Sequence, residues 1–484
     1  MPARRVRSVI VHQAYRFALD PTPAQARALS AHCGAARFAF NWGLALVKAV
    51  MDQREAEKSH GIAPEDLTPA LQWSHYSLLW IWNRAKHEVA PWWTECSKEA
   101  YSGGLYRLAP ALKNWTDSRT GKRTGPTVQF PRFKSRRRAR RFTTGGIRVE
   151  PDRRHVTLPK LGRIRTYEST RKLARRIEAG TARVTSATVC FEGGRWFCAF
   201  TCEVQRNDPP PAQPDAVVGV DLGVAHPAVL SRPLHGVTDA AGFVLNPKHF
   251  VRESTALRRI SRKVSRRCGP DRRTGARPSK RWERANQRRN RLHCRVANMR
   301  RDGLQKLTAA LATEFGTIVV EDLNVAGMLR NRRLARSIAD AGFAEVRRQL
   351  AYKTRWRGSR LVVADRWFPS SKTCSDCGVV KTKLPLHIRV FHCEWCGLEI
   401  DRDLNAARNL AALAASSTAG TGVAGDLEPS GSNGRGADCK TCAPRAGSRE
   451  AFTSHRATVS DEDRRLGSAR DSRRIGSPSR PSGS

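Results

Sequence analysis

The sequence predicts a multidomain α+β protein, in which an α/β domain follows a small β domain that carries a helical insertion. Apolar strands alternate with amphipathic helices over residues 215–411, as they do in α/β folds. Short alternating strands at 8–19 and after 125 enclose a helical stretch at 22–115. Two CxxC pairs within 371–400 indicate a small metal-bound insertion near the end of the α/β domain.

The β domain is expected to begin with a strand at 8–19, where apolar and polar residues alternate. Thr22 is then placed as a helix N-cap, with Pro23 in the first helical position. We expect this half of the chain to hold three segments: the first strand of the β domain at 1–20, a helical insertion at 21–120 and the rest of the β domain at 121–208.

Six tryptophans mark the helical stretch and allow two interpretations. We favour packing in a hydrophobic core, and stacking on nucleic-acid bases is the alternative. The six are Trp73, Trp80, Trp82, Trp92, Trp93 and Trp115.

A basic run bracketed by aromatic residues spans 130–142, and a hairpin is expected around Glu192-Gly193-Gly194. Basic and aromatic side chains interleaved on strands suit phosphate contacts combined with base stacking. A solvated basic face is the alternative. The candidate nucleic-acid-binding residues here are Arg136, Arg137, Arg138, Arg140 and Arg141.

The α/β domain follows a proline-rich linker at 207–214 and is expected to begin with an apolar strand that ends in Asp221. Residues 252–301 are dense in arginine, and a Gly-Pro interruption at 269–278 predicts two helices with a buried stripe and a basic outer side. The candidate nucleic-acid-binding residues here are Arg258, Arg259, Arg262, Arg288 and Arg289.

Three further elements complete this domain. A second apolar strand ends in Glu321, one helix is expected at 335–354, and a short strand is expected at 360–365. We place the domain at 215–370 and 401–411, with the cysteine insertion at 371–400 between them.

The two CxxC pairs, Cys374/Cys377 and Cys393/Cys396, are each followed by a glycine that allows the chain to fold back around a metal. Four thiolates in two such pairs are the usual ligands of a closed, structural zinc site. Two disulfides or four unrelated thiols are the alternative. A lone pair, Cys439/Cys442, has no second pair beside it, and we assign it no metal.

Three acids occupy comparable places: Asp221 and Glu321 end strands, and Asp403 opens a helix after the cysteines. Carboxylates near a core need a partner, and oxygen ligands select Mg²⁺ or Mn²⁺ over zinc. Two such ions would activate a water and stabilise the leaving oxygen of a phosphodiester. Any one of these acids alone is more often a simple cap, so only their combination favours a nuclease site.

Net charge is +44 with 87 basic residues, which points to a polyanionic partner. We find no run of eighteen apolar residues, no lipidation motif and no secretory signal, so no membrane association is expected. Thirteen cysteines, four of them expected to bind metal, suit a reducing cytoplasm. From 412 to 484 the chain loses periodicity, and we expect a disordered basic tail without an assigned function.

The chain resembles the TnpB family, the OrfB-type proteins of bacterial insertion sequences that are related to compact type V CRISPR nucleases. The resemblance covers about residues 14–411. It rests on YRFALDPTPAQ, ARFAFNWGLA, FPRFKSRRRARRF, VGVDLGV, IVVEDLN, LAYKTRWRG, FPSSKTCSDCG and CEWCGLEIDRDLNAARN. The resemblance implies an RNase-H-like (RuvC) nuclease domain with a zinc insertion, preceded by a β-barrel wedge domain that carries a helical recognition insert.

The family's catalytic triad matches Asp221, Glu321 and Asp403, with Asp401 as the fallback for the third acid. The resemblance therefore implies an RNA-guided DNA endonuclease that uses two Mg²⁺ ions and a transposon-encoded guide RNA. Such a protein would act as a monomeric ribonucleoprotein and cut target DNA beside a short motif. Two alternatives stay open: a transposase that joins strands, and a cleavage-inactive RNA-guided repressor.

Overall fold

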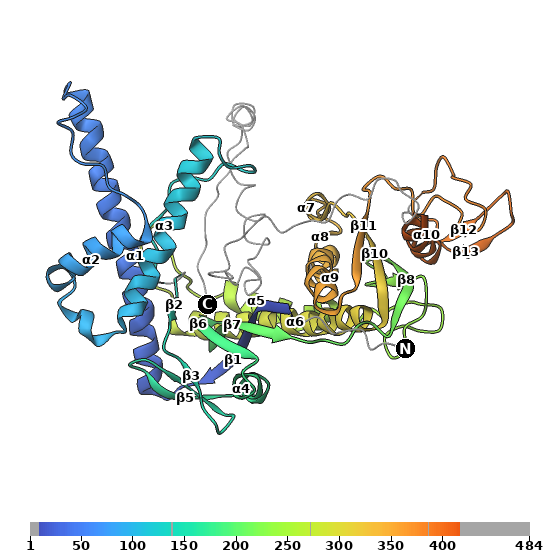
Figure 1. The fold of residues 1–484 in the computed structure, drawn as a ribbon, viewed down its shortest axis with the longest axis horizontal. Coiled ribbons are helices and arrows are strands. Elements are labelled where there is room, and N and C mark those ends of the chain that lie inside the picture. Colours follow the sequence, from blue (N-terminus) through green and yellow to red (C-terminus); the bar gives the residue numbers. More distant parts are fainter. Residues whose placement is uncertain (1–8, 137–138, 272, 386, 417–484) are drawn as a thin grey trace, which may run out of the picture. The chain divides into compact units, whose positions relative to one another are not determined.

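The computed structural model describes residues 9–136, 139–271, 273–385 and 387–416 (Figure 1). The described chain contains a seven-stranded sheet in the order β2-β6-β7-β1-β5-β4-β3, a four-stranded sheet in the order β11-β10-β8-β9, and a two-stranded ribbon, β12-β13. The α+β class predicted from the sequence is therefore observed. None of the described helices is long and apolar enough to cross a membrane.

The seven-stranded sheet is antiparallel throughout. The hairpin predicted around Gly193-Gly194 is confirmed, because both glycines have positive φ (56° and 86°) and join β6 to β7 in a two-residue turn. In the described residues no pairing joins β2 to β3, so closure into a barrel stays a prediction. The strands are β1 (Val9–Asp20), β2 (Arg141–Thr144), β3 (Arg148–Val149), β4 (His155–Leu158), β5 (Gly162–Thr166), β6 (Ala182–Glu192) and β7 (Arg195–Arg206), with α4 (Arg171–Glu178) between β5 and β6.

Three long helices separate β1 from β2: α1 (Pro23–Ser59), α2 (His75–Val89) and α3 (Lys98–Arg119), with a 3-10 turn at Pro91–Glu95. Thr22 caps α1 as predicted and forms a capping box with Gln25. These helices and the seven-stranded sheet share one hydrophobic core, in which Leu29, Phe40, Tyr101, Phe142 and Phe200 are buried.

The tryptophans of this helical stretch do not share one environment. Trp82 is 3% exposed and stacks on Tyr101, which confirms core packing for that residue. Trp80 and Trp92 are 52% and 47% exposed, so core packing is wrong for these two. The Arg84 guanidinium covers Trp80 at 4.2 Å from the ring centroid.

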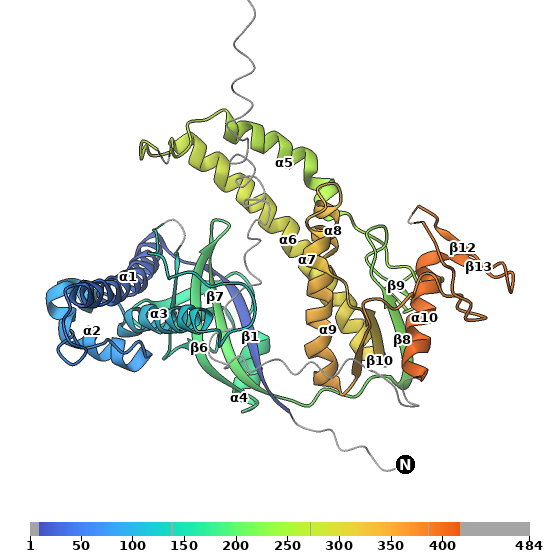
Figure 2. The ribbon, with the colours of Figure 1, turned by 90° about the horizontal axis from the view of Figure 1, so that it is seen from above.

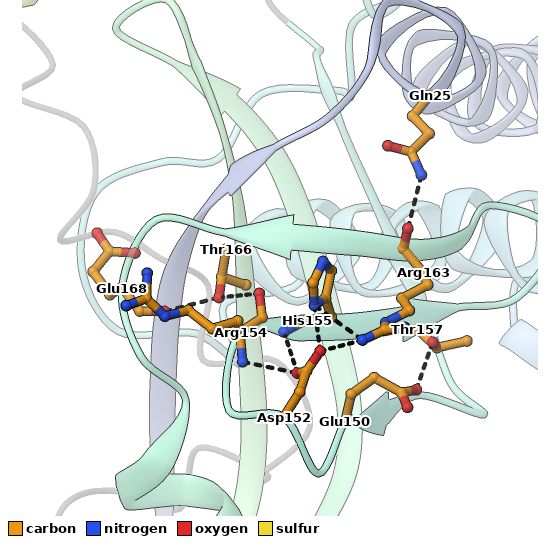
Figure 3. Close-up of polar contacts among 9 residues, drawn as sticks. All are labelled: Gln25, Glu150, Asp152, Arg154, His155, Thr157, Arg163, Thr166 and Glu168. Carbon is orange, nitrogen blue, oxygen red and sulfur yellow. Dashed lines mark hydrogen bonds and ion pairs between the residues drawn. The ribbon is translucent and has the colours of Figure 1, made fainter.

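A polar network fixes the strands β3 to β5 against the start of α1 (Figure 3). Asp152 accepts hydrogen bonds from the backbone N–H groups of Arg154 and His155 (2.9 and 3.0 Å) and from the side chains of His155 and Arg163. These bonds, that from Arg154 first, hold the pKa of Asp152 well below its ordinary value. The Gln25 amide donates to the Arg163 carbonyl at 2.8 Å, which links β5 to α1.

The four-stranded sheet is mixed: β10 runs parallel to β8 and β11, and β9 runs antiparallel to β8. Its strands are β8 (Gln213–Asp221), β9 (Val229–Leu230), β10 (Phe315–Glu321) and β11 (Arg360–Ala364). The helices of this part are α5 (His249–Ser265), α6 (Lys280–Glu314), α7 (Val325–Met328), α8 (Ala335–Ala341), α9 (Phe343–Arg357) and α10 (Arg402–Ser416). The ribbon strands β12 (Val390–His392) and β13 (Glu399–Asp401) precede α10.

Helices cover both faces of this sheet (Figure 2). Ile318 and Val320 of β10 pack in one cluster with residues of α6 and α9, whereas Val319 packs with Leu410 and Ala414 of α10. Successive side chains of a strand point to opposite faces, so α6 and α9 lie on one face and α10 lies on the other.

Three boundaries differ from the predictions. The linker is shorter than 207–214, because β8 already includes Pro214. The single helix expected at 335–354 is two helices, since Gly342 has a φ of 72° and ends α8. Helix α10 continues through Ser416, beyond the predicted end at 411. The expected disordered tail lies outside the described residues from 417 onward, as does Cys439/Cys442. The predicted break between α5 and α6 is confirmed.

Candidate functional site

Asp221 and Glu321 lie at the same edge of the four-stranded sheet. Val319 pairs with Gly219 and Val320 with Val220 in the parallel register of β10 and β8, so Glu321 and Asp221 follow as the next residues on neighbouring strands. Residues in register on parallel strands direct their side chains to the same face, with strands about 4.8 Å apart. The two strands therefore deliver two carboxylates side by side.

Gly219 brings helix α10, and with it Asp403, to the same place. A Cβ on Gly219 would lie only 1.9 Å from the Ala407 carbonyl oxygen and 2.6 Å from the Ala411 nitrogen, so the helix backbone rests directly on the strand. Asp221 is two residues beyond Gly219, on the same face of β8. Asp403 is about one helical turn before Ala407, which sets it beside Asp221.

Asp401 has a different local role from Asp403. Its Oδ1 accepts hydrogen bonds from the backbone N–H groups of Asp403 (2.9 Å) and Leu404 (3.1 Å), which is the geometry of a helix cap for α10. The Asp403 carboxylate makes a longer contact, 3.5 Å, with the guanidinium of Arg389.

The four carboxylates repel one another at this edge. Burial raises the pKa of Asp221 well above its ordinary value, and the charges of Glu321, Asp403 and Asp401 raise it further, while Arg402 opposes them. Geometry places Asp403 in the same neighbourhood, because a Cβ on Gly223, two residues beyond Asp221, would lie 3.9 Å from Asp403 Oδ2.

Asp403 is perturbed in the same direction. Burial and the charge of Asp401 raise its pKa, and the cations Arg389 and Arg402 lower it. Burial is the larger cause in both residues, and a bound cation would favour the charged form of both carboxyl groups. Oxygen ligands of this kind suit a hard divalent ion such as Mg²⁺.

Four cysteines form the tightest group of metal-ligating side chains in the described residues. The ligand atoms of Cys374, Cys377, Cys393 and Cys396 all lie within 4.8 Å of one another, and no three carboxylates in the described chain are gathered as closely. The Sγ atoms of Cys374 and Cys396, and those of Cys377 and Cys393, are 3.6 Å apart, so no disulfide joins them. The edge of a tetrahedron with Zn–S bonds of ~2.3 Å is about 3.8 Å, so the group fits a tetrahedral metal ion.

The two cysteine turns repeat one local geometry. Gly378 N–H donates to the Cys374 carbonyl and Gly397 N–H to the Cys393 carbonyl, at 3.0 and 2.9 Å, with φ of 78° and 75° at the glycines. The backbone N–H groups of Cys396 and Trp395 help to lower the pKa of Cys393 to about 6, whereas the neighbouring cysteines raise the pKa values of Cys377 and Cys396, as expected when four thiols share one site without a cation.

A hydrogen-bond network that sequence reasoning missed joins these cysteines to the acids. Ser370 donates to Glu321 Oε1 at 2.6 Å, and Asn409 of α10 donates to the carbonyl oxygens of Ser370 and Thr373, both at 2.7 Å. Asn405 donates to Thr373 at 2.7 Å and accepts from the Ser375 N–H at 2.9 Å. The signal was the pair of asparagines four residues apart, and therefore on one face of the helix, because a buried amide needs partners.

Comparison with known proteins identifies the chain as a whole. Family models match residues 11–55 (Helix-turn-helix domain, OrfB_IS605), 199–332 (Probable transposase, OrfB_IS605) and 343–410 (Cas12f1-like, TNB domain). A relative in Mycobacterium tuberculosis is 42% identical over 91% of this chain and 93% of its own length. A relative in Escherichia coli strain K12, InsQ, is 30% identical over 83% of this chain and 92% of its own length. Both are named as RNA-guided DNA endonucleases.

The chain belongs to the TnpB family. The resemblance drawn from the sequence motifs is thereby confirmed. Among solved structures, the cryo-EM structure of a Cas12f1–sgRNA–target DNA complex aligns with a TM-score of 0.42 and 14% identity, over 83% of this chain and 99% of that one. A likeness that distant carries no inference about function.

The arginines proposed for nucleic-acid contact in this TnpB-family chain fall into three groups. Six are exposed on the surface: Arg136, Arg141, Arg258, Arg259, Arg262 and Arg288. Arg140 is half-buried and stacks on Phe191 at 3.8 Å from the ring centroid, and Arg289 is half-buried with a 2.7 Å hydrogen bond to Asn286. Arg137 and Arg138 lie outside the described residues.

Proposed function

We propose that this TnpB-family protein is an RNA-guided, Mg²⁺-dependent DNA endonuclease of a transposable element. The observation that carries the proposal is the position of Asp221, Glu321 and Asp403 at one sheet edge. There, burial and the charges of Glu321 and Asp403 all raise the pKa of Asp221. The net charge of +44 fits a nucleic-acid partner on the scale of a guide RNA and its target. The names of the relatives agree with this activity.

We infer that the domain carrying these acids is RNase-H-like. The strand order supports this. On one side of β8, β9 pairs antiparallel with it, and Phe243 forms a bridge with Val229 of β9. On the other side of β8, β10 and then β11 run parallel to it. The acids then stand at the ends of the two central strands and on the helix that packs across one of them. In this proposal the domain runs from the start of β8 at Gln213 to 370 and from 401 to the end of α10 at Ser416, and the seven-stranded sheet with its insertion, over 9–206, forms the wedge and recognition parts.

Mg²⁺ is the metal that we assign to the acids. Carboxylate oxygens fit it, and the raised pKa values of Asp221 and Asp403 are what an acid cluster shows before a cation neutralises it. When bound, two such ions would activate a water and stabilise the leaving 3′ oxygen of the phosphodiester.

The chain's own residues would position the ligands. Ser370 fixes the orientation of Glu321 through its hydrogen bond, and Asp401 caps α10 and so sets the height of Asp403 over the sheet. The capping role leaves Asp403, rather than Asp401, as the third catalytic acid in our proposal. Arg389, 3.5 Å from Asp403, would balance charge at the rim.

Zinc is the metal that we assign to the four cysteines. All four positions of a tetrahedral ion would be filled by protein thiolates, so this site has no open position for a substrate. Its role is structural: it closes the ribbon, and the ribbon is joined to α10 and to Glu321 through Asn405, Asn409 and Ser370.

The partners in this proposal are a transposon-encoded guide RNA and target DNA, bound by a monomeric ribonucleoprotein at the bacterial nucleoid. The exposed arginines of α5 and α6, among them Arg258, Arg259, Arg262 and Arg288, would contact phosphates. The guide would read the target by base pairing, and the protein would read a short adjacent motif.

The deciding experiment is cleavage by the protein purified with RNA from its own locus. A plasmid that matches the guide should be cut when Mg²⁺ is present, and the Asp221→Ala protein should bind the same RNA without cutting. Failure to cut with Mg²⁺, together with identical behaviour of Asp221→Ala, would refute the proposal.

Strand transfer in transposition is the second candidate, because the family model over 199–332 is described as a probable transposase. RNase-H-like transposases use similar acids, so the product separates the two: transposon ends joined to new DNA, or a guide-matched site cleaved. Tight guide-dependent binding without cleavage would instead indicate a repressor.

A further inference from the structure

An exposed tryptophan stands in the turn that follows β11. Trp367 is 84% exposed, the largest exposed fraction among the large apolar side chains of the described residues. Exposure alone assigns no role, because single apolar residues are common on protein surfaces. The structure of this turn and its attachments are what distinguish Trp367.

Three hydrogen bonds from backbone N–H groups fix the conformation of this turn. The Trp367 N–H donates to Asp365 Oδ1 at 2.8 Å, the Phe368 N–H donates to the Asp365 carbonyl at 3.1 Å, and the Ser370 N–H donates to the Phe368 carbonyl at 2.8 Å. The Phe368 ring packs against the cluster that contains Val319. An exposed indole on a fixed turn loses little conformational freedom when a flat partner stacks on it.

Both ends of the turn are attached to the segment that carries a catalytic acid. Arg366 donates to Asp322 Oδ2 at 2.5 Å, and Ser370 donates to Glu321 Oε1 at 2.6 Å. Trp367 lies between these two attachments, and consecutive Cα atoms are ~3.8 Å apart. Trp367 therefore lies one residue after the first attachment and three before the second, on a turn bonded to Glu321 at the sheet edge that holds Asp221, Glu321 and Asp403, here called the acid edge.

Two arginines with partly exposed side chains form ion pairs with acids of this region, Arg366 with Asp322 and Arg389 with Asp403. The Arg366 side chain is 47% exposed, and that of Arg389, which contacts Asp403, is 61% exposed. An aromatic platform beside exposed guanidinium groups is the arrangement that binds single-stranded nucleic acid without sequence preference. Sequence-tolerant contact suits a protein whose sequence choice is made by a guide.

We propose that Trp367 is a positioning residue that stacks on an unpaired base of the DNA strand held at the acid edge, next to the phosphate to be cut. This inference rests on the proposed function and deepens it. Stacking there fixes the strand so that the scissile phosphate meets Asp221, Glu321 and Asp403. Trp367 acts on the substrate's position and takes no part in proton transfer.

The test uses the complete ribonucleoprotein with Trp367→Ala, Trp367→Phe and, as matched control, Leu245→Ala, since Leu245 is also 77% exposed but lies in the loop before α5. Single-turnover cleavage is measured with target DNAs that carry one abasic site at successive positions near the cut. We expect Trp367→Ala to cut about tenfold more slowly, with unchanged target affinity, and Trp367→Phe to retain most of the rate. At one position, the abasic site should slow cleavage by the wild-type protein as much as Trp367→Ala slows cleavage of intact DNA. The same abasic site should not slow the Trp367→Ala protein any further.

The inference is overturned if Trp367→Ala cuts at the wild-type rate, if every abasic position slows it further, or if target affinity falls in step with the rate. These results are distinct from failure of the proposed function, in which wild-type and Asp221→Ala proteins behave alike. A second measurement does not need cleavage: quenching of 2-aminopurine in a short single-stranded DNA should accompany binding to the wild-type complex and be lost in Trp367→Ala. Equal quenching in both would also overturn it.

Discussion

Gly219→Ala should damage the candidate active site without touching any of its acids. The added Cβ would lie 1.9 Å from the Ala407 carbonyl oxygen and 2.6 Å from the Ala411 nitrogen. Both obstructing atoms belong to the backbone of α10, so no change of side-chain rotamer relieves the clash. The helix must move away from β8, and it carries Asp403.

The size of the effect follows from these distances. Restoring an ordinary contact of 3.4 Å requires α10 to retreat by roughly 1.5 Å. Overpacking of a well-packed interface typically costs about 1–3 kcal/mol, and the absence of a side chain that can yield places this site at the upper end. A misplacement of about 1 Å at a catalytic group can cost about 100-fold in rate.

The assay combines denaturant unfolding with single-turnover cleavage of a guide-matched target. We expect Gly219→Ala to lower the free energy of unfolding by about 3 kcal/mol and the cleavage rate by about 100-fold. Gly303→Ala is the matched control, because Gly303 lies within helix α6 with no atom within 4 Å of an added Cβ. That variant should be neutral or slightly stabilising. A Gly219→Ala protein with wild-type stability and rate would refute the reasoning about how α10 is seated.

Three further outcomes are expected. Asp403→Asn should lower the cleavage rate by at least about 100-fold. Asp401→Asn should stay within about tenfold of the wild-type rate, because asparagine also caps helices. Equal losses of rate in the two variants would contradict the assignment of Asp403 as the third acid. Cys374→Ser, or removal of zinc by a chelator, should lower the bound zinc measured by atomic absorption and expose the ribbon to protease, and an unchanged digestion pattern would contradict a structural metal. Burial lowers the pKa of Lys353 from 10.5 to about 8, so between these pH values the unfolded chain binds more protons than the folded chain, and the free energy of unfolding should rise with pH by up to about 3 kcal/mol. Urea titrations at several pH values should show this rise in the wild-type protein and not in Lys353→Met. An equal dependence of the unfolding free energy on pH in both proteins would disprove the assignment to Lys353.

The strands that end in acids could be predicted because their signals are local. An apolar run that stops at a carboxylate identifies β8 and β10 without knowledge of any distant residue, and the spacing of the cysteines identifies the ribbon. The boundary at Gly342 was missed for the opposite reason. The apolar periodicity of Ile338, Phe343 and Val346 continues across it, so the positive φ at the glycine is visible only in the folded chain.

Contacts between distant elements could not be predicted. Gly219 is an ordinary strand glycine in the sequence, and only the approach of α10 shows why a side chain cannot be accommodated there. The two environments of Trp82 and Trp80 likewise depend on which side of α2 meets the core. Residues at helical spacing indicate which positions share a face, but not which other element covers that face.

The acid edge and the cysteine ribbon are one mechanical unit, although their metals would do different work. Ser370 donates a hydrogen bond to Glu321, and Asn409 donates one to the Ser370 carbonyl oxygen. Asn409 lies on α10, the helix whose first turn contains Asp403. Loss of the ribbon's metal should therefore reach the acids through these hydrogen bonds, because unfolding the ribbon frees the loop that orients Glu321. Asn409→Ala separates this linkage from metal loss itself: it leaves the cysteines intact, yet should slow cleavage while the bound zinc stays unchanged. If Asn409→Ala cuts at the wild-type rate, the ribbon and the acids are neighbours without mechanical coupling.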